Sequence, residues 1–169
     1  MPRYREKHIS ISTIILVVLL VVACIGGSLY FINSKRELND DNLLSVDEYQ
    51  IVDEKTSIGL KVDVKEDGKI YVSGKASEDW EAVIQTVTLD EGTYTVGGCN
   101  SNVGTYGIVV KKDGTPIAYA GTNGTQGATF TVDASGTYTV SIFVMEDTTL
   151  YRTFAPTLAS GKKAISFYE

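Results

Sequence analysis

Apolar and polar residues alternate with a period of two through most of this chain, and no other feature constrains the fold more. Residues 58–64 show the pattern first, with an apolar side chain at every second position. Such alternation places one row of side chains in a core and the other in water, as in a strand with one buried face. Similar runs follow at residues 70–74, 82–89, 93–96, 106–110, 116–120, 130–132, 138–144 and 150–158. About eight or nine short strands without a helical period predict an all-β fold, an antiparallel sandwich or a barrel.

Acidic, glycine-containing segments separate these runs and predict turns. We expect hairpins over residues 58–74, 82–96, 106–120 and 130–144. Pro116 predicts that its strand lies at a sheet edge, since proline lacks the backbone N–H that a central strand needs. The pentapeptide Gly-Thr-Tyr-Thr-Val occurs at residues 92–96 and again at 136–140, each time after an acidic turn. Two copies suggest pseudo-symmetric hairpins in two facing sheets, which favours a jelly roll over an immunoglobulin-like sandwich.

Three segments carry a resemblance to a known family. They are Thr88–Gly98, Phe130–Val144 and Thr153–Leu158, the last followed by a glycine turn at Gly161. Together they look like the carbohydrate-binding-module-like jelly rolls of phage tail and baseplate proteins and of Gram-positive surface proteins. The resemblance implies a jelly-roll fold and a sugar-binding role. Phage virion parts normally lack an apolar anchor, which this chain has, so a role at a bacterial cell surface is favoured.

That anchor is the stretch of residues 9–32, which is apolar almost without a break and contains no charged side chain. At about 1.5 Å per residue, a helix of this length reaches roughly 36 Å, enough to cross a hydrocarbon core of about 30 Å. The flank of residues 1–8 is basic, and acidic residues follow soon after the span. This bias predicts a signal anchor with a cytoplasmic N-terminus. We expect residues 33–54 to form an acidic stalk and residues 55–169 to form an extracellular β-sandwich domain.

Two alternatives to an uncleaved transmembrane helix remain open. A cleaved secretory signal would have a shorter apolar core and a small-residue cleavage site. Val21-Val22-Ala23-Cys24 resembles a relaxed bacterial lipobox, in which Cys24 would be the lipidated first residue of a mature lipoprotein. Apolar residues continue past Cys24, and this favours the uncleaved helix. In the helix and lipoprotein interpretations alike, the rest of the chain is held at the membrane and faces outward.

Charge and residue usage exclude several function classes. The formal net charge is -6, and the acidic excess is larger beyond residue 32, so nucleic acid is not an expected partner. Cys24 lies in the apolar stretch, which leaves Cys99 without a disulfide partner, and we expect Cys99 to be a small buried group. The only histidine, His8, lies on the cytoplasmic flank. The outward domain therefore lacks the histidine of a catalytic triad or of a usual zinc site, and we expect no enzyme.

Glycan binding requires exposed aromatic faces together with amide or carboxylate groups. Trp80, the only tryptophan, lies in an acidic loop and is the first candidate, although it would equally pack over an open end of the sandwich. Tyr119 next to a Gly-rich loop, with Asn123 and Gln126, forms a second candidate patch. Further tyrosines occupy inward positions of the alternation and are expected in the core. These are Tyr94, Tyr106 and Tyr138.

Metal binding has weaker support. Jelly-roll sugar binders often hold a structural calcium ion, which needs several oxygen ligands. The candidate ligands are Asp63, Asp79, Glu81, Glu146 and Asp147, none in an EF-hand spacing, so we expect no cofactor. The sequence thus favours a single-pass, outward-facing, non-catalytic module that binds a glycan or another surface component. The alternative is a structural or assembly protein that docks onto a partner protein, for example by adding a strand at the edge of residues 116–120.

Overall fold

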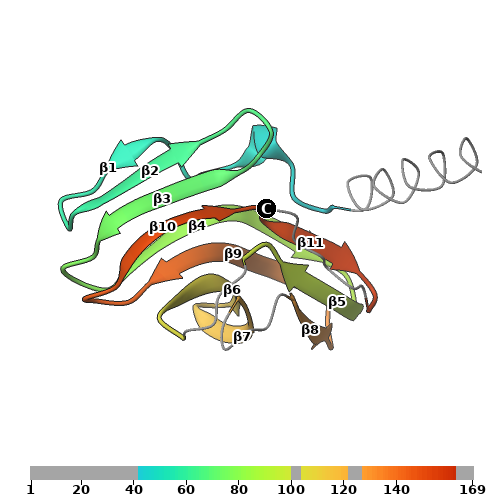
Figure 1. The fold of residues 1–169 in the computed structure, drawn as a ribbon. Coiled ribbons are helices and arrows are strands. Elements are labelled where there is room, and N and C mark those ends of the chain that lie inside the picture. The colour runs from blue at the N-terminus through green and yellow to red at the C-terminus, as the bar shows by residue number, and fades with distance from the viewer. Residues whose placement is uncertain (1–41, 100–103, 122–126, 163–169) are drawn as a thin grey trace, which may run out of the picture. The chain divides into compact units, whose positions relative to one another are not determined.

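The computed structural model describes residues 42–99, 104–121 and 127–162 (Figure 1). These residues belong to a compact unit that begins at Asn42. The predicted flank at residues 1–8, the anchor at 9–32, and Cys24 lie outside the described residues. Within the described ranges, no helix is long and apolar enough to span a bilayer.

The described chain is all-β, as the alternation predicts. It contains eleven strands and one short 3-10 helix, η1 (Val46–Glu48). The strands are β1 (Glu54–Lys55), β2 (Leu60–Val64), β3 (Ile70–Lys75), β4 (Trp80–Leu89), β5 (Gly92–Gly97), β6 (Tyr106–Lys112), β7 (Thr115–Ala120), β8 (Gly127–Val132), β9 (Gly136–Val144), β10 (Thr149–Phe154) and β11 (Thr157–Ser160). β1 was not expected. The run at residues 150–158 divides into two strands separated by Ala155 and Pro156, and Pro156 has no N–H to donate to a ladder.

The strands form three antiparallel sheets, in the orders β1-β2-β3-β10, β11-β5-β8 and β4-β9-β6-β7. Four of the pairings are nested along the chain, because β3 pairs with β10, β4 with β9, β5 with β8 and β6 with β7. β10 continues directly into β11, so the first two sheets are joined by one stretch of chain (Figure 1). Pro116 lies in β7, at the end of its sheet, as predicted for an edge strand.

Two of the predicted hairpins are confirmed and two are wrong. β2 pairs with β3, and β6 pairs with β7. The hairpin over residues 82–96 is wrong because β4 pairs with β9 and not with β5, and the hairpin over residues 130–144 is wrong because β8 pairs with β5 and not with β9. The acidic turns that precede the two Gly-Thr-Tyr-Thr-Val copies therefore carry the chain from one sheet to another. An apolar alternation looks the same on either side of such a turn, so it cannot distinguish a hairpin from a crossover between sheets.

One hydrophobic core joins all three sheets. Tyr106 of β6 meets the fully buried Phe154 of β10 edge-on, with ring centroids 6.2 Å apart, so side chains from different sheets interlock. Tyr94 stacks on Phe130, and Tyr138 is also buried, which confirms the three tyrosines expected in the core. Cys99 is buried and unpaired, also as expected.

Residues 42–54, which the sequence assigned to an acidic stalk, pack as part of this unit. Leu44 and Ile51 are buried in the core. The backbone N–H of Leu43 donates to the carbonyl of Leu158 in β11, and that of Gln50 donates to the carbonyl of Ile84 in β4. Scattered apolar residues in an acidic segment do not form a regular period, and this is why the sequence pattern missed the packing.

Candidate functional site

A hollow of about 190 Å³ lies on the outer face of the sheet β4-β9-β6-β7. The period of two places Phe143 and Val109 on this face, opposite to core residues such as Ile108 and Ile142. The lining comprises Asp79, Trp80, Glu81, Val109, Lys111, Pro116, Tyr119, Phe143, Val144 and Met145. Trp80 and Tyr119 were predicted as two separate patches, and the fold brings both into this one hollow.

Three aromatic residues line the hollow, and the rings of two of them, Tyr119 and Phe143, meet on its face. Tyr119 is 46% exposed, and its ring meets the ring of Phe143 edge-on at 5.7 Å between centroids. Gly107 pairs with Phe143 across the ladder, and a Cβ at Gly107 would lie 3.1 Å from the Phe143 ring. The glycine therefore lets Phe143 lie close to the sheet. Trp80 was expected in a loop, but it is the first residue of β4 and pairs with the buried Val144 across the ladder. It is partly buried and packs against the core, and it also lines the hollow.

Charged groups border the aromatic surface. Lys111 of β6 forms an ion pair with Glu81 of β4, across the intervening strand β9. Their side chains are only 21% and 35% exposed, so this pair is partly shielded from water. One carboxylate oxygen of Asp79, Oδ1, accepts the backbone N–H of Glu146 at 2.7 Å. This bond joins the β3–β4 loop to the β9–β10 loop and fixes the position of Asp79 at the edge of the hollow.

An orphaned hydroxyl lies on the same face. Ser141 of β9 is fully buried, and its Oγ has no hydrogen-bond partner in the part of the chain that the structure describes. Ser141 pairs with Val83 on one side and with Val109, a lining residue, on the other. A buried hydroxyl without a partner costs about 1–3 kcal/mol, and Ser141 is not among the residues that line the hollow.

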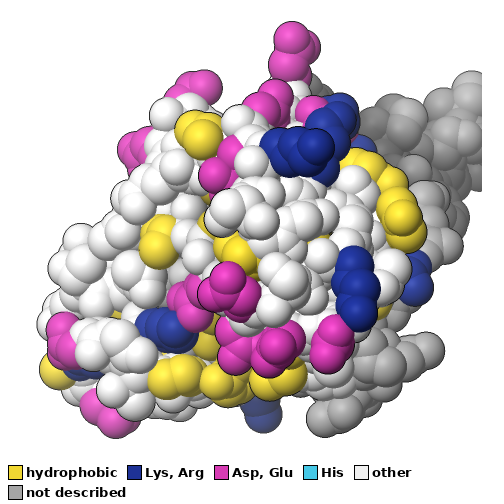
Figure 2. All heavy atoms as spheres, turned by 90° about the vertical axis from the view of Figure 1, so that its left-hand side faces the viewer, with side chains coloured by type: hydrophobic (Ala, Val, Ile, Leu, Met, Phe, Trp, Pro, Cys, Tyr) yellow, Lys and Arg dark blue, Asp and Glu magenta, His cyan; other side chains and the backbone are white. Residues whose placement is uncertain are grey.

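Acidic side chains gather at the end of the molecule where β3 and β9 end and β4 and β10 begin, and hydrophobic side chains are exposed among them (Figure 2). The two loops at this end hold each other through backbone hydrogen bonds between Ala76 and residues 147–148. Lys75 pairs with Asp147 at 2.8 Å, and the hydrogen bond from the ammonium lowers the pKa of that carboxyl.

The candidate calcium ligands do not form a metal site in the described ranges. No group of three or more His, Cys, Asp or Glu side chains there could hold a metal ion. Asp63 lies on β2, in a different sheet from Asp79, and pairs with Lys65 at 2.6 Å. That hydrogen bond lowers the pKa of Asp63.

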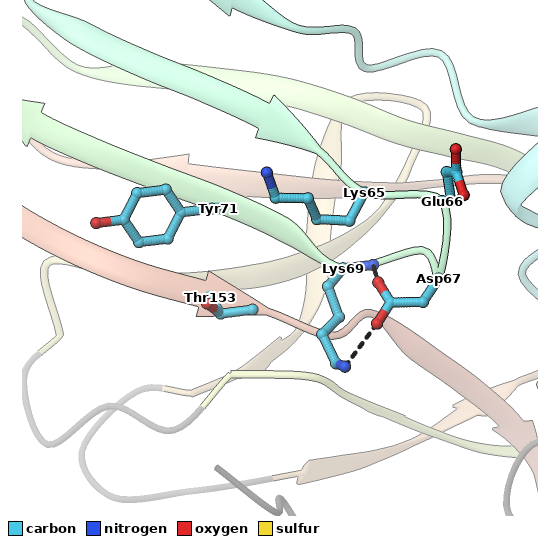
Figure 3. A pocket seen from close by; sticks show the side chains of 6 residues that line it. All are labelled: Lys65, Glu66, Asp67, Lys69, Tyr71 and Thr153. Atoms are coloured by element: carbon cyan, nitrogen blue, oxygen red, sulfur yellow. Dashed lines mark hydrogen bonds and ion pairs between the residues drawn. The ribbon is translucent and has the colours of Figure 1, made fainter.

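A larger hollow, of about 580 Å³, lies beside the β2–β3 turn (Figure 3). Its lining comprises Lys65, Glu66, Asp67, Lys69, Tyr71 and Thr153. Figure 3 shows these side chains spread along the surface, with Lys69 bonded to Asp67 through both its ammonium and its backbone N–H. The Lys69 ammonium lowers the pKa of Asp67. Because its lysines are already paired and Tyr71 is its only ring, this hollow offers less for recognition than the one lined by Trp80.

The sequence located part of the candidate site. Asn123 and Gln126, the amides placed beside Tyr119, lie outside the described residues. Phe143 and Lys111 were missed. Phe143 could have been identified from the sequence, because it is a large aromatic residue at an outward position between Ile142 and Val144, which are both buried. Comparison of the chain with protein-family models, with curated proteins and with solved structures gave no match.

Proposed function

We propose that residues 42–169 form a jelly-roll sandwich. The support is the nesting of the strand pairs β3·β10, β4·β9, β5·β8 and β6·β7, which is what results when one long hairpin is wound into two sheets. In the proposed sandwich, the sheet β4-β9-β6-β7 faces a layer made of the other two sheets, β1-β2-β3-β10 and β11-β5-β8. The resemblance to carbohydrate-binding-module-like jelly rolls is compatible with this arrangement.

The function of this sandwich is to bind a glycan without catalysis, outside the cell, on a membrane anchor at residues 9–32. The observation that carries the proposal is the convergence of Trp80, Tyr119 and Phe143 on one hollow with a polar border. Sugar rings present apolar C–H faces that stack on aromatic rings, and their hydroxyls bond to charged and amide groups. A volume of about 190 Å³ accommodates one ring of a longer chain, since it is below the roughly 300–1,000 Å³ of drug-sized pockets.

The test is a glycan-array screen of residues 42–169, a unit that contains its own core, beside the Tyr119→Ala variant. Tyr119 is exposed enough for its removal to leave the fold intact, whereas Trp80 also packs on the core. Tyr151→Ala is the matched control, because Tyr151 is 68% exposed on β10 and does not line the hollow. We expect binding to fall about five- to tenfold in Tyr119→Ala and to persist in the control. If the folded protein binds no glycan on a broad array, the proposal is refuted.

A second candidate function is docking onto a partner protein at β7. The observation that favours it is the position of β7 at the end of its sheet, with Ile117 39% exposed. An edge strand presents backbone groups to which another strand adds. Ile117→Lys would block such addition while leaving the ring of Tyr119 in place. Partner binding that is lost in Ile117→Lys and retained in Tyr119→Ala would favour docking over glycan binding.

A further inference from the structure

The border of the hollow carries acidic charge that its basic residues do not neutralise. Lys111 is engaged by Glu81. Asp79, which also lines the hollow, has no ion-pair partner in the described ranges, and its second carboxylate oxygen has no hydrogen-bond partner there. The exposed carboxylates of Glu78 and Glu146 flank Asp79 in the two loops, and they likewise form no ion pair in the described part.

A carboxylate beside aromatic rings favours one kind of ligand charge. The faces of Trp and Tyr rings attract a cation, and a nearby carboxylate strengthens that attraction with a charge-assisted hydrogen bond. The same field repels uronate or phosphate groups.

We propose that the hollow selects a sugar ring that bears a free amine, such as a glucosamine unit, over its N-acetylated form and over acidic sugars. Asp79 is the ion partner of the amine, and the exposed ring of Tyr119 contacts the sugar face beside Phe143 and Trp80. This inference rests on the proposed glycan-binding function. The N-acetylated unit keeps the stacking and loses the charge, so the two ligands separate the amine contribution from the binding of sugars in general.

The experiment compares residues 42–169 with the variant Asp79→Asn in calorimetric titrations. The probes are oligomers of glucosamine, of N-acetylglucosamine and of galacturonate, each at low and at high salt. Asparagine keeps an oxygen that accepts the Glu146 N–H, so the variant removes charge without releasing the loop. Asp133→Asn is the matched control, because Asp133 is an exposed turn residue between β8 and β9, at the other end of β9 from the hollow.

We expect glucosamine oligomers to bind the most tightly and salt to weaken their binding. Asp79→Asn should weaken glucosamine binding about fivefold, weaken N-acetylglucosamine binding much less and reduce the salt dependence. Equal affinity for the amine and N-acetyl forms would overturn the selectivity while preserving glycan binding. Absence of binding to all three oligomers and to the wider array would instead overturn the proposed function. A lysine-rich peptide that competes with glucosamine on equal terms would overturn the assignment to sugars, since the hollow would then recognise cations in general.

Discussion

Gln85 holds the segment of residues 42–51 against the sheets, and replacing it tests whether that segment belongs to the folded unit. Its side chain is only 3% exposed. Oε1 accepts the backbone N–H of Ser45 at 2.9 Å, and Nε2 donates to the Glu48 carboxylate at 2.7 Å. The variant Gln85→Leu keeps a similar volume and removes both bonds.

The expected loss follows from these two contacts. A neutral hydrogen bond contributes about 1 kcal/mol and one to a charged group about 1.5–3 kcal/mol, with the lower end appropriate here because Glu48 is exposed. Part of this loss is offset by the apolar surface that leucine buries. We therefore expect the free energy of unfolding to fall by about 2 kcal/mol. With a urea m-value of about 1–3 kcal/mol per M, the midpoint of unfolding should shift down by about 0.7–2 M.

The assay is urea unfolding of residues 42–169 followed by circular dichroism. Thr86→Val is the control, since Thr86 accepts only an exposed hydrogen bond from Gln50 and its loss should cost less than about 0.5 kcal/mol. A double-mutant cycle with Glu48→Ala should give a coupling energy of about 0.5–1.5 kcal/mol. If Gln85→Leu behaves like the control and the coupling is zero, the segment is not anchored as described.

Three further predictions concern the fold. Gly98 has φ +121°, and a Cβ there would lie 2.4 Å from the Ala155 carbonyl oxygen, so Gly98→Ala should cost more than about 2 kcal/mol in urea unfolding. Gly114→Ala, with open space around it, should cost about 1 kcal/mol, and equal costs would contradict the close approach. Burial raises the pKa of Cys99 to about 12 from an ordinary 9.0, so the native thiol should resist iodoacetamide at pH 8 and react in urea. Only the unfolded thiol ionises near pH 9. The free energy of unfolding should therefore stay constant below that pH and fall as the pH rises toward 12. Native alkylation at the unfolded rate would refute this burial. Deleting residues 42–51 removes two buried apolar side chains and should cost about 3–6 kcal/mol, and an unchanged urea midpoint would show that they are dispensable.

Local patterns predicted the strands because each strand has one buried face. Residues 58–64 and 138–144 alternate cleanly, and both form strands. The sequence pattern did not predict which strands share a sheet. The turns before the two Gly-Thr-Tyr-Thr-Val copies look like hairpin turns, but they connect strands of different sheets. Hydrophobic period fixes which face of a strand is buried and does not fix its partner. The nesting of the pairs emerges only from long-range packing.

The candidate site likewise combines residues that local sequence predicted with an arrangement that only long-range packing sets. Trp80 and Tyr119 were predicted from residue type, because aromatic residues are enriched at binding surfaces, although Trp80 begins β4 and does not lie in a loop. That they line one hollow depends on β4 and β7 lying at opposite ends of the same sheet, with β9 and β6 between them. Phe143 completes the surface from β9, and the Lys111–Glu81 pair spans that strand. Such meetings of distant strands are not encoded in local spacing.

Trp80 is the only tryptophan in the chain and lines the hollow, so its fluorescence reports directly on the proposed site. The decisive measurement is a titration of residues 42–169 with an array-positive glycan while Trp80 emission is followed. Our account predicts a saturable change in emission at the affinity found by calorimetry, weakened in Tyr119→Ala and retained in Tyr151→Ala. Tight glycan binding that leaves the Trp80 emission unchanged would place the ligand elsewhere and contradict the account.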